Sequence, residues 1–125
     1  MNDACTHRLM IVDDSNIMRR KIERSQELPN VEVVGTAGNG REALDLHAAS
    51  RPTLVTMDLT MPEMDGIECV EQLVGRDPDI RILVISALAD KATAIEALEK
   101  GASGFLCKPF TERQLNEALV KLIES

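Results

Sequence analysis

The sequence predicts an α/β fold in which an open parallel sheet carries helices on both faces. Two observations predict it. Short apolar stretches alternate with longer amphipathic ones along the 125 residues, and three of the short stretches are nearly continuous runs rich in branched residues, as expected of strands covered on both sides. Because βα units cross over with a right hand, five strands alternating with five helices form a doubly wound sheet.

Five apolar stretches are the predicted strands. The second of them alternates apolar and polar residues more than the others, which suits a strand at the edge of the sheet. The predicted strands are Arg8–Val12, Val31–Ala37, Thr53–Met57, Ile80–Ser86 and Gly104–Cys107.

Amphipathic spacing predicts a helix after each strand. The last helix has the clearest apolar stripe, and Thr111 with Gln114 forms a capping-box pattern at its start. The first helix is weaker, because only Ile17, Met18 and Ile22 fall on a possible buried face. The predicted helices are Ser15–Leu28, Arg41–Ala49, Gly66–Gly75, Lys91–Lys100 and Glu112–Ile123.

Length and composition narrow the class of protein. A chain of 125 residues without a linker-like stretch predicts one domain over residues 1–125. The net charge of −7 opposes direct binding to nucleic acid. No apolar run reaches the roughly 20 residues of a membrane helix, so we expect a cytoplasmic protein without membrane insertion. The three cysteines, Cys5, Cys69 and Cys107, are far apart, which favours reduced thiols over disulfides or zinc ligands.

Polar residues follow four of the predicted strands. The carboxyl ends of parallel strands share one edge of the sheet, where ligands of such folds bind. Each of these residues alone is ordinary for a loop, but together they predict a site. They are Asp13 and Asp14 after the first strand, Asp58 after the third, Ser86 at the end of the fourth, and Lys108 with Pro109 after the fifth.

Three carboxylates in one crevice repel one another, so either one keeps a proton or a cation lies among them. Their hard oxygens favour Mg²⁺, or alternatively Mn²⁺, over zinc. Mg²⁺ commonly also binds phosphate oxygens, and Lys108 and Ser86 could supply a counter-charge and a hydroxyl donor for such a group. Because the sequence has no nucleotide-binding glycine loop, we expect the phosphoryl group to be attached to a carboxylate.

Four motifs in order give the chain a family resemblance. It resembles, over nearly its whole length, the receiver domain of bacterial two-component response regulators, and its layout is similar to that of the single-domain chemotaxis receivers. This resemblance implies a flavodoxin-like sheet with strand order 2-1-3-4-5. The motifs are VDDS (Val12–Ser15), MDLTMPEMDG (Met57–Gly66), VISA (Val84–Ala87) and GFLCKPF (Gly104–Phe110).

The resemblance implies a phosphoryl-transfer site around Asp58. Asp58 would be the phosphoacceptor, charged by the phosphohistidine of a histidine kinase. Asp14 and Asp58 would bind Mg²⁺ through their side chains and Thr60 through its backbone carbonyl, while Asp13 would act through water. The chain would thus catalyse its own phosphorylation and dephosphorylation without being a metabolic enzyme.

The resemblance also implies a switch and an output surface. Ser86 would bind a phosphoryl oxygen and Lys108 would pair with the phosphate. Phe105 occupies the aromatic switch position, although packing in the core is an alternative for it. The peptide bond from Lys108 to Pro109 is expected to be cis, which a following proline makes accessible. A downstream protein would bind the fourth helix, fifth strand and fifth helix.

Two positions depart from the pattern of enteric chemotaxis receivers. Thr60 and Leu88 stand where those receivers carry an amide and an acid, and in the family these positions tune the loss of the phosphoryl group. We hypothesise that Leu88 hinders an attacking water or a phosphatase, so Leu88→Glu should change the phosphoryl lifetime.

Several alternatives stay open at this point. The chain could be a receiver excised from a larger regulator, a phosphorelay intermediate, a haloacid-dehalogenase-like hydrolase, or a scaffold that is not phosphorylated. The end of the last predicted helix at the end of the chain leads us to expect action by direct protein contact. The basic run Arg19–Lys21 could dock a kinase or simply form an exposed helix face, and His7 and His47 are expected at the surface or partly packed.

Overall fold

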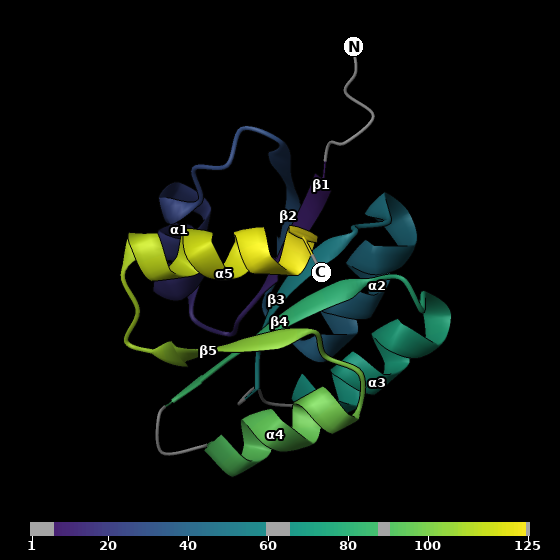
Figure 1. The fold of residues 1–125 in the computed structure, drawn as a ribbon. Coiled ribbons are helices and arrows are strands. Elements are labelled where there is room, and N and C mark those ends of the chain that lie inside the picture. Colours follow the sequence, from purple (N-terminus) through teal and green to yellow (C-terminus); the bar gives the residue numbers. More distant parts are fainter. Residues whose placement is uncertain (1–6, 60–65, 88–90, 125) are drawn as a thin grey trace.

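The computed structural model describes residues 7–59, 66–87 and 91–124. Its sheet has five parallel strands in the order β2-β1-β3-β4-β5, which confirms the predicted flavodoxin-like topology. Figure 1 shows this sheet between its helices. The strands are β1 (His7–Val12), β2 (Val31–Ala37), β3 (Leu54–Asp58), β4 (Arg81–Ala87) and β5 (Gly104–Lys108).

The central strands are buried and the edge strands are not, as the sequence predicts. All five residues of β3 are buried, whereas β2 at one edge is buried only at its two end residues, Val31 and Ala37. The strands β3 and β5 each extend one residue further than predicted, so that Asp58 and Lys108 are the last residues of their strands. Both side chains therefore extend from backbone that is paired within the sheet rather than from a loop.

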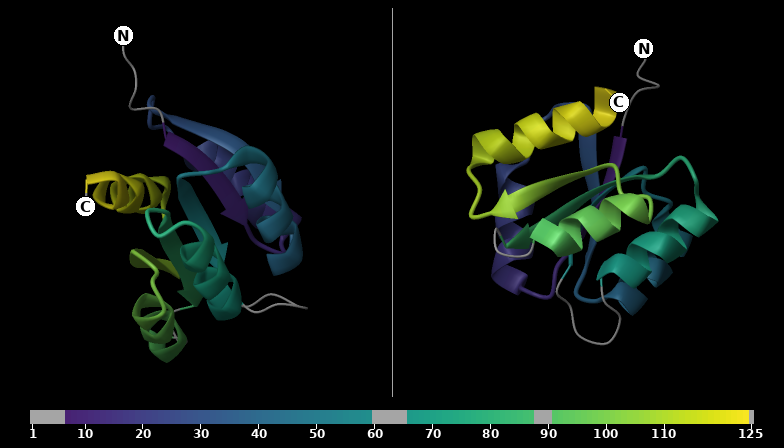
Figure 2. Two further views of the ribbon diagram at one scale, coloured as in Figure 1. Left: turned by 90° about the vertical axis from the view of Figure 1, so that its right-hand side faces the viewer. Right: turned by 60° about the horizontal axis from the view of Figure 1, so that its bottom comes forward.

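Two helical layers cover the sheet, as Figures 1 and 2 show. The helices α1 and α5 pack on one face over Leu9 and Ile11, and α2, α3 and α4 pack on the other over Met10 and Val12. This division follows from the pleat, because successive side chains of a strand point to opposite faces. The helices are α1 (Asn16–Ser25), α2 (Gly40–Ser50), α3 (Gly66–Arg76), α4 (Lys91–Glu99) and α5 (Glu112–Glu124).

The first helix differs from its prediction in two ways. It ends at Ser25 rather than Leu28, and Gln26 is already extended (φ −69°, ψ 121°). Leu28 precedes Pro29, and a residue before proline is disfavoured in a helix. The buried stripe contains Ile22 and the partly buried Met18, but Ile17 is 82% exposed. The prediction that Ile17 belongs to the buried face is therefore wrong.

Side chains cap the two helices on this layer, and the cap of α5 is the capping box that the sequence predicts. The Ser15 hydroxyl accepts a hydrogen bond from the Met18 amide (3.2 Å) at the start of α1. At the start of α5, the Thr111 hydroxyl accepts from the Gln114 amide (3.1 Å) and the Gln114 side chain accepts from the Thr111 amide (2.9 Å). These reciprocal bonds form the capping box and fix where α5 begins after β5.

Two further expectations concern His47 and membrane insertion. His47 is buried on α2, deeper than a partly packed surface residue, and this burial lowers the pKa of its imidazole. Within the described ranges, no helix is long and apolar enough to cross a membrane.

Candidate functional site

Three acidic side chains meet at the carboxyl edge of the sheet. Asp13 and Asp14 follow β1, and Asp58 ends β3 on the neighbouring strand. One carboxylate oxygen of each lies within 4.8 Å of the others. Asp13 and Asp58 are buried whereas Asp14 is exposed, so the cluster is open to solvent on one side. The prediction that these three acids share one crevice is confirmed.

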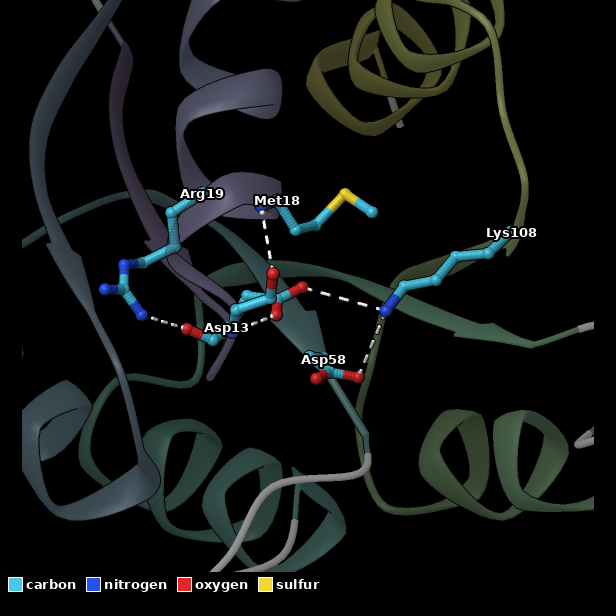
Figure 3. Close-up of polar contacts among 6 residues, drawn as sticks. Asp13, Met18, Arg19, Asp58 and Lys108 are labelled. Carbon is cyan, nitrogen blue, oxygen red and sulfur yellow. Dashed lines mark hydrogen bonds and ion pairs between the residues drawn. The ribbon is translucent and has the colours of Figure 1, made fainter.

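Lys108 places its ammonium between two of these carboxylates, as Figure 3 shows. Its Nζ lies 3.8 Å from Asp13 Oδ2 and 3.7 Å from Asp58 Oδ1. Both distances are longer than a hydrogen bond, so the ammonium acts here by charge. Because the Asp13 and Asp58 side chains are only 2% and 3% exposed, solvent screens this attraction little.

Asp13 is held through its backbone as well as its side chain. Its Oδ1 accepts a hydrogen bond from the Ser15 amide (2.8 Å), and its own amide donates to Ala37 O (3.0 Å) on the neighbouring strand. Burial raises the pKa of the Asp13 carboxyl, and the charges of Asp58 and Asp14 add to the rise. The Ser15 amide and the Lys108 charge act against it. The protein therefore places an unfavourable negative charge at this position.

A divalent cation fits this donor set. Three carboxylates against one ammonium leave an excess of negative charge in a partly buried site, and hard oxygens are the ligands that Mg²⁺ prefers. Asp13 Oδ2 is buried and accepts no hydrogen bond from the described part of the chain. The cluster is consistent with the Mg²⁺ site expected from the sequence.

Ser86 lies near the carboxyl end of β4, and Phe105 lies on the neighbouring strand β5. Ser86 is buried, and its Oγ has no hydrogen-bond partner among the described residues. Phe105 pairs with Val84, two residues before Ser86 on the same strand, so all three side chains face the same side of the sheet. Phe105 is 37% exposed and belongs to neither core cluster. The alternative that it packs in the core is therefore wrong.

Of the remaining site predictions, the one for the Lys108–Pro109 peptide bond falls within the described residues and those for Thr60 and Leu88 do not. The peptide bond between Lys108 and Pro109 is cis. Thr60 and Leu88, expected to tune the phosphoryl lifetime, lie outside the described residues, as does any contribution of the Thr60 carbonyl to a metal.

Sequence reasoning missed two contacts made by the basic run of α1. Arg19 turns inward, and its guanidinium donates to the backbone carbonyl of Asp13. Lys21 places its Nζ 3.5 Å from Phe110 O and 5.0 Å from the centre of the Phe110 ring. Arg20 and Lys21 are exposed whereas Arg19 is partly buried, so the run is not the uniformly exposed helix face that both interpretations assumed. No local pattern shows these contacts, because each joins α1 to a different loop.

The helix α3 begins directly against the end of β3, at Gly66. A Cβ added to Gly66 would lie 2.6 Å from both Asp58 O and Leu59 Cα. Backbone atoms cannot move aside as the end of a flexible side chain can. The absence of a side chain at Gly66 thus allows α3 to start beneath the strand that carries Asp58.

We expect Gly66→Ala to lower the free energy of unfolding by about 1 to 3 kcal/mol, the usual cost of overpacking. Urea unfolding followed by circular dichroism measures it. Gly75→Ala is the matched control, because a Cβ there meets nothing within 4 Å. It should raise the stability by up to about 1 kcal/mol, since alanine favours a helix over glycine. Equal effects of the two substitutions would contradict this account of Gly66.

The fold and the acidic site together define a class of protein. The chain matches the response regulator receiver domain family over residues 9–120, and it belongs to that family. Among individual relatives, it is 42% identical over 115 residues to the chemotaxis protein CheY of Thermotoga maritima, covering 92% of this chain and 96% of that one. The chain is thus a CheY-like receiver.

Solved structures agree with this assignment. The receiver domain of AraT from Geobacillus stearothermophilus superposes with a TM-score of 0.89 at 31% identity, covering 95% of this chain and 94% of that one. CheY of Borrelia burgdorferi, solved in a complex with CheX, BeF3 and Mg²⁺, superposes with a TM-score of 0.85 at 29% identity, covering 92% of this chain and 87% of that one.

Proposed function

We propose that the chain is a phosphorylation-controlled signalling switch whose phosphoacceptor is Asp58. The observation that carries the proposal is the position of Lys108 Nζ, 3.7 Å from Asp58 Oδ1 and 3.8 Å from Asp13 Oδ2, inside a cluster of three carboxylates. A cation fixed beside a buried carboxylate can neutralise an incoming phosphoryl group. The three carboxylates supply the oxygens that a divalent metal needs.

The proposed reaction is transfer of a phosphoryl group from a histidine kinase. An oxygen of Asp58 attacks the phosphorus atom of the phosphohistidine, the P–N bond breaks, and the imidazole leaves with its electron pair and takes up a proton. Lys108 balances the charge on the phosphoryl oxygens. Bound Mg²⁺, held by Asp14, Asp58 and the Thr60 carbonyl with Asp13 through water, would neutralise further charge. Hydrolysis of the resulting acyl phosphate would return the Asp58 carboxylate.

The proposed switch starts at Ser86. Its buried Oγ, which has no partner within the described ranges, would donate a hydrogen bond to a phosphoryl oxygen on Asp58. Ser86, Val84 and Phe105 share one side of the sheet, and Val84 packs in the same cluster as Ala94 and Ala97 of α4. A shift of Ser86 would therefore favour another rotamer of Phe105 and another surface over α4, β5 and α5, where a target protein would bind.

A docking surface for the kinase is proposed on α1. Ile17, 82% exposed, lines one surface hollow together with Arg20 and Arg24. An apolar side chain flanked by cations suits an acidic surface on the kinase. The chemotaxis protein CheY relatives support a role in chemotaxis or motility, which we propose is exercised in the cytoplasm through direct protein contact. The BeF3 and Mg²⁺ in the complex of the Borrelia relative support a metal-dependent phosphoryl site.

Intact mass spectrometry after incubation with acetyl phosphate tests the phosphoacceptor. With Mg²⁺, the wild type should gain one phosphoryl group, and Asp58→Asn should gain none because an amide cannot attack. Omission of Mg²⁺ should abolish the adduct. The matched control is Asp45→Asn, which changes an exposed carboxylate on α2 and should be labelled like the wild type. A wild type that gains no adduct, or an equal adduct on Asp58→Asn, would contradict the proposal.

A further inference from the structure

We propose that Arg19 is a positioning residue for the metal site, acting through the main chain of Asp13. The inference rests on the proposed function, because it concerns Mg²⁺ bound at the acidic cluster. Within the described ranges, the Arg19 side chain forms no ion pair with any of the three carboxylates. Its guanidinium instead donates through Nη1 to the carbonyl oxygen of Asp13, as Figure 3 shows.

The arginine is itself held in place. Its second nitrogen, Nη2, donates to Asn16 Oδ1 (3.1 Å), and its amide donates to Ser15 O (3.0 Å) in the first turn of α1. The side chain is partly buried. A planar guanidinium that binds two oxygens in a fork has little rotational freedom left, so it fixes the orientation of the carbonyl that it binds.

The bond to Arg19 completes the fixing of Asp13. The amide of Asp13 is bonded to Ala37 O, Oδ1 accepts from the Ser15 amide, and Oδ2 faces Lys108. The carbonyl oxygen is the remaining polar atom, and it belongs to the peptide unit that leads into Asp14. Fixing that peptide unit fixes the direction in which the Asp14 carboxylate leaves the backbone. Mg²⁺ requires near-octahedral ligand geometry, so this direction controls its affinity.

The neighbouring loop leaves room for the guanidinium at Gly38. A Cβ built on Gly38 would lie 3.2 Å from Arg19 Nη1 and 3.4 Å from Glu42 Oε1, and that same oxygen accepts a hydrogen bond from the Gly38 amide (2.8 Å). A branched side chain at residue 38 would displace the guanidinium without changing any charge. A substitution at Gly38 therefore tests the position of the guanidinium separately from its charge.

The loss of the Arg19 charge and the loss of its positioning contact predict opposite changes in the affinity for Mg²⁺. Removing a positive charge near an acidic cluster should by itself strengthen the binding of a dication. Losing an outer contact that orients metal ligands typically weakens metal binding about 10- to 100-fold. We expect the second effect to prevail in Arg19→Gln. Arg41→Gln is the matched control, because it removes the same charge from the exposed first turn of α2. Among the described residues, Arg41 forms no ion pair with the acidic cluster.

Isothermal titration with Mg²⁺ in chelator-treated buffer measures the effect without any phosphoryl transfer. Arg19→Gln should weaken Mg²⁺ binding about tenfold or more, Arg19→Lys should lie between it and the wild type, and Gly38→Val should share the weakening. Arg41→Gln should bind Mg²⁺ as well as the wild type or slightly better. Phosphorylation of Arg19→Gln by acetyl phosphate should recover when Mg²⁺ is raised to saturation, because the defect lies in metal affinity.

The outcomes separate this inference from the proposed function. Wild-type affinity in Arg19→Gln, beside a wild type that binds Mg²⁺, would overturn the role of Arg19 alone. Equal weakening in Arg19→Gln and Arg41→Gln would also overturn it, since a general effect of charge would then explain both. A wild type that binds no Mg²⁺ would overturn the metal site of the proposed function and this inference with it. Unfolding curves in chelator identify a variant that fails to fold, and Gly38→Val, with Arg19 intact, then supplies the test.

Discussion

Replacing Lys108 with methionine is expected to slow phosphorylation by acetyl phosphate about 10²-fold, the scale seen when one preorganised donor to developing charge is removed. The Lys108 Nζ lies within 3.8 Å of oxygens on both buried carboxylates, so its removal leaves the incoming phosphoryl group opposite uncompensated charge. Methionine keeps the length and most of the apolar volume of the lysine stem. The time course of the phosphoryl adduct at saturating Mg²⁺, followed by intact mass, measures the rate.

A control variant and a second measurement make this prediction more specific. Lys100→Met is the control, because the Lys100 side chain pairs with Glu71 (3.5 Å) where both side chains are exposed. This variant should be phosphorylated like the wild type. Lys108→Met should bind Mg²⁺ more tightly than the wild type, since it removes a cation from the site. Slow phosphorylation together with tighter metal binding would separate charge neutralisation from metal affinity. An unchanged rate would show that the ammonium does not assist transfer.

Asp13→Asn is expected to raise the free energy of unfolding in chelator by about 1 to 2 kcal/mol, although most substitutions destabilise. Burial and the neighbouring carboxylates disfavour the Asp13 charge more than Lys108 favours it, as the raised pKa indicates. Asparagine keeps an oxygen that can accept the hydrogen bond from the Ser15 amide. Urea unfolding with and without Mg²⁺ measures the effect.

Mg²⁺ should reduce this difference in stability between Asp13→Asn and the wild type. Bound metal stabilises the native state by mass action, so it should stabilise the wild type more than Asp13→Asn, which lacks one of the three carboxylates. Asp45→Asn should leave both stabilities unchanged, because Asp45 is exposed on α2. A lower stability of Asp13→Asn in chelator would mean that the ion pair with Lys108 outweighs the burial of the charge.

The sequence was most informative where a residue's role depends on its own strand. The apolar runs of β1, β3 and β4 identify buried parallel strands, and the topology then brings Asp13, Asp58 and Ser86 to one edge. The acidic cluster could be predicted for this reason. The edge position of β2 was also predicted from its sequence pattern, because an edge strand is less buried than the central strands and carries more polar residues.

The sequence was least informative where a role depends on contacts between distant elements. Ile17 has an apolar side chain like those of the core but is exposed to solvent. The buried stripe of α1 runs through Ile22 instead. In the sequence Gly66 looks like the first residue of any helix, and only the structure shows that the end of β3 lies against it. Lys21 reaches Phe110 across 89 positions of the chain. Periodicity carries no information about such contacts.

The placement of Phe105 has a spectroscopic consequence. The chain has two phenylalanines and neither tryptophan nor tyrosine, and these two rings flank Lys108 on either side along the sequence. One ring is partly exposed beside the proposed output surface, and the other is buried against α5. A fluorine label on phenylalanine would therefore give two resonances, one from each ring. Chemistry at Asp58 could be followed in real time from both, without introducing a probe by mutation.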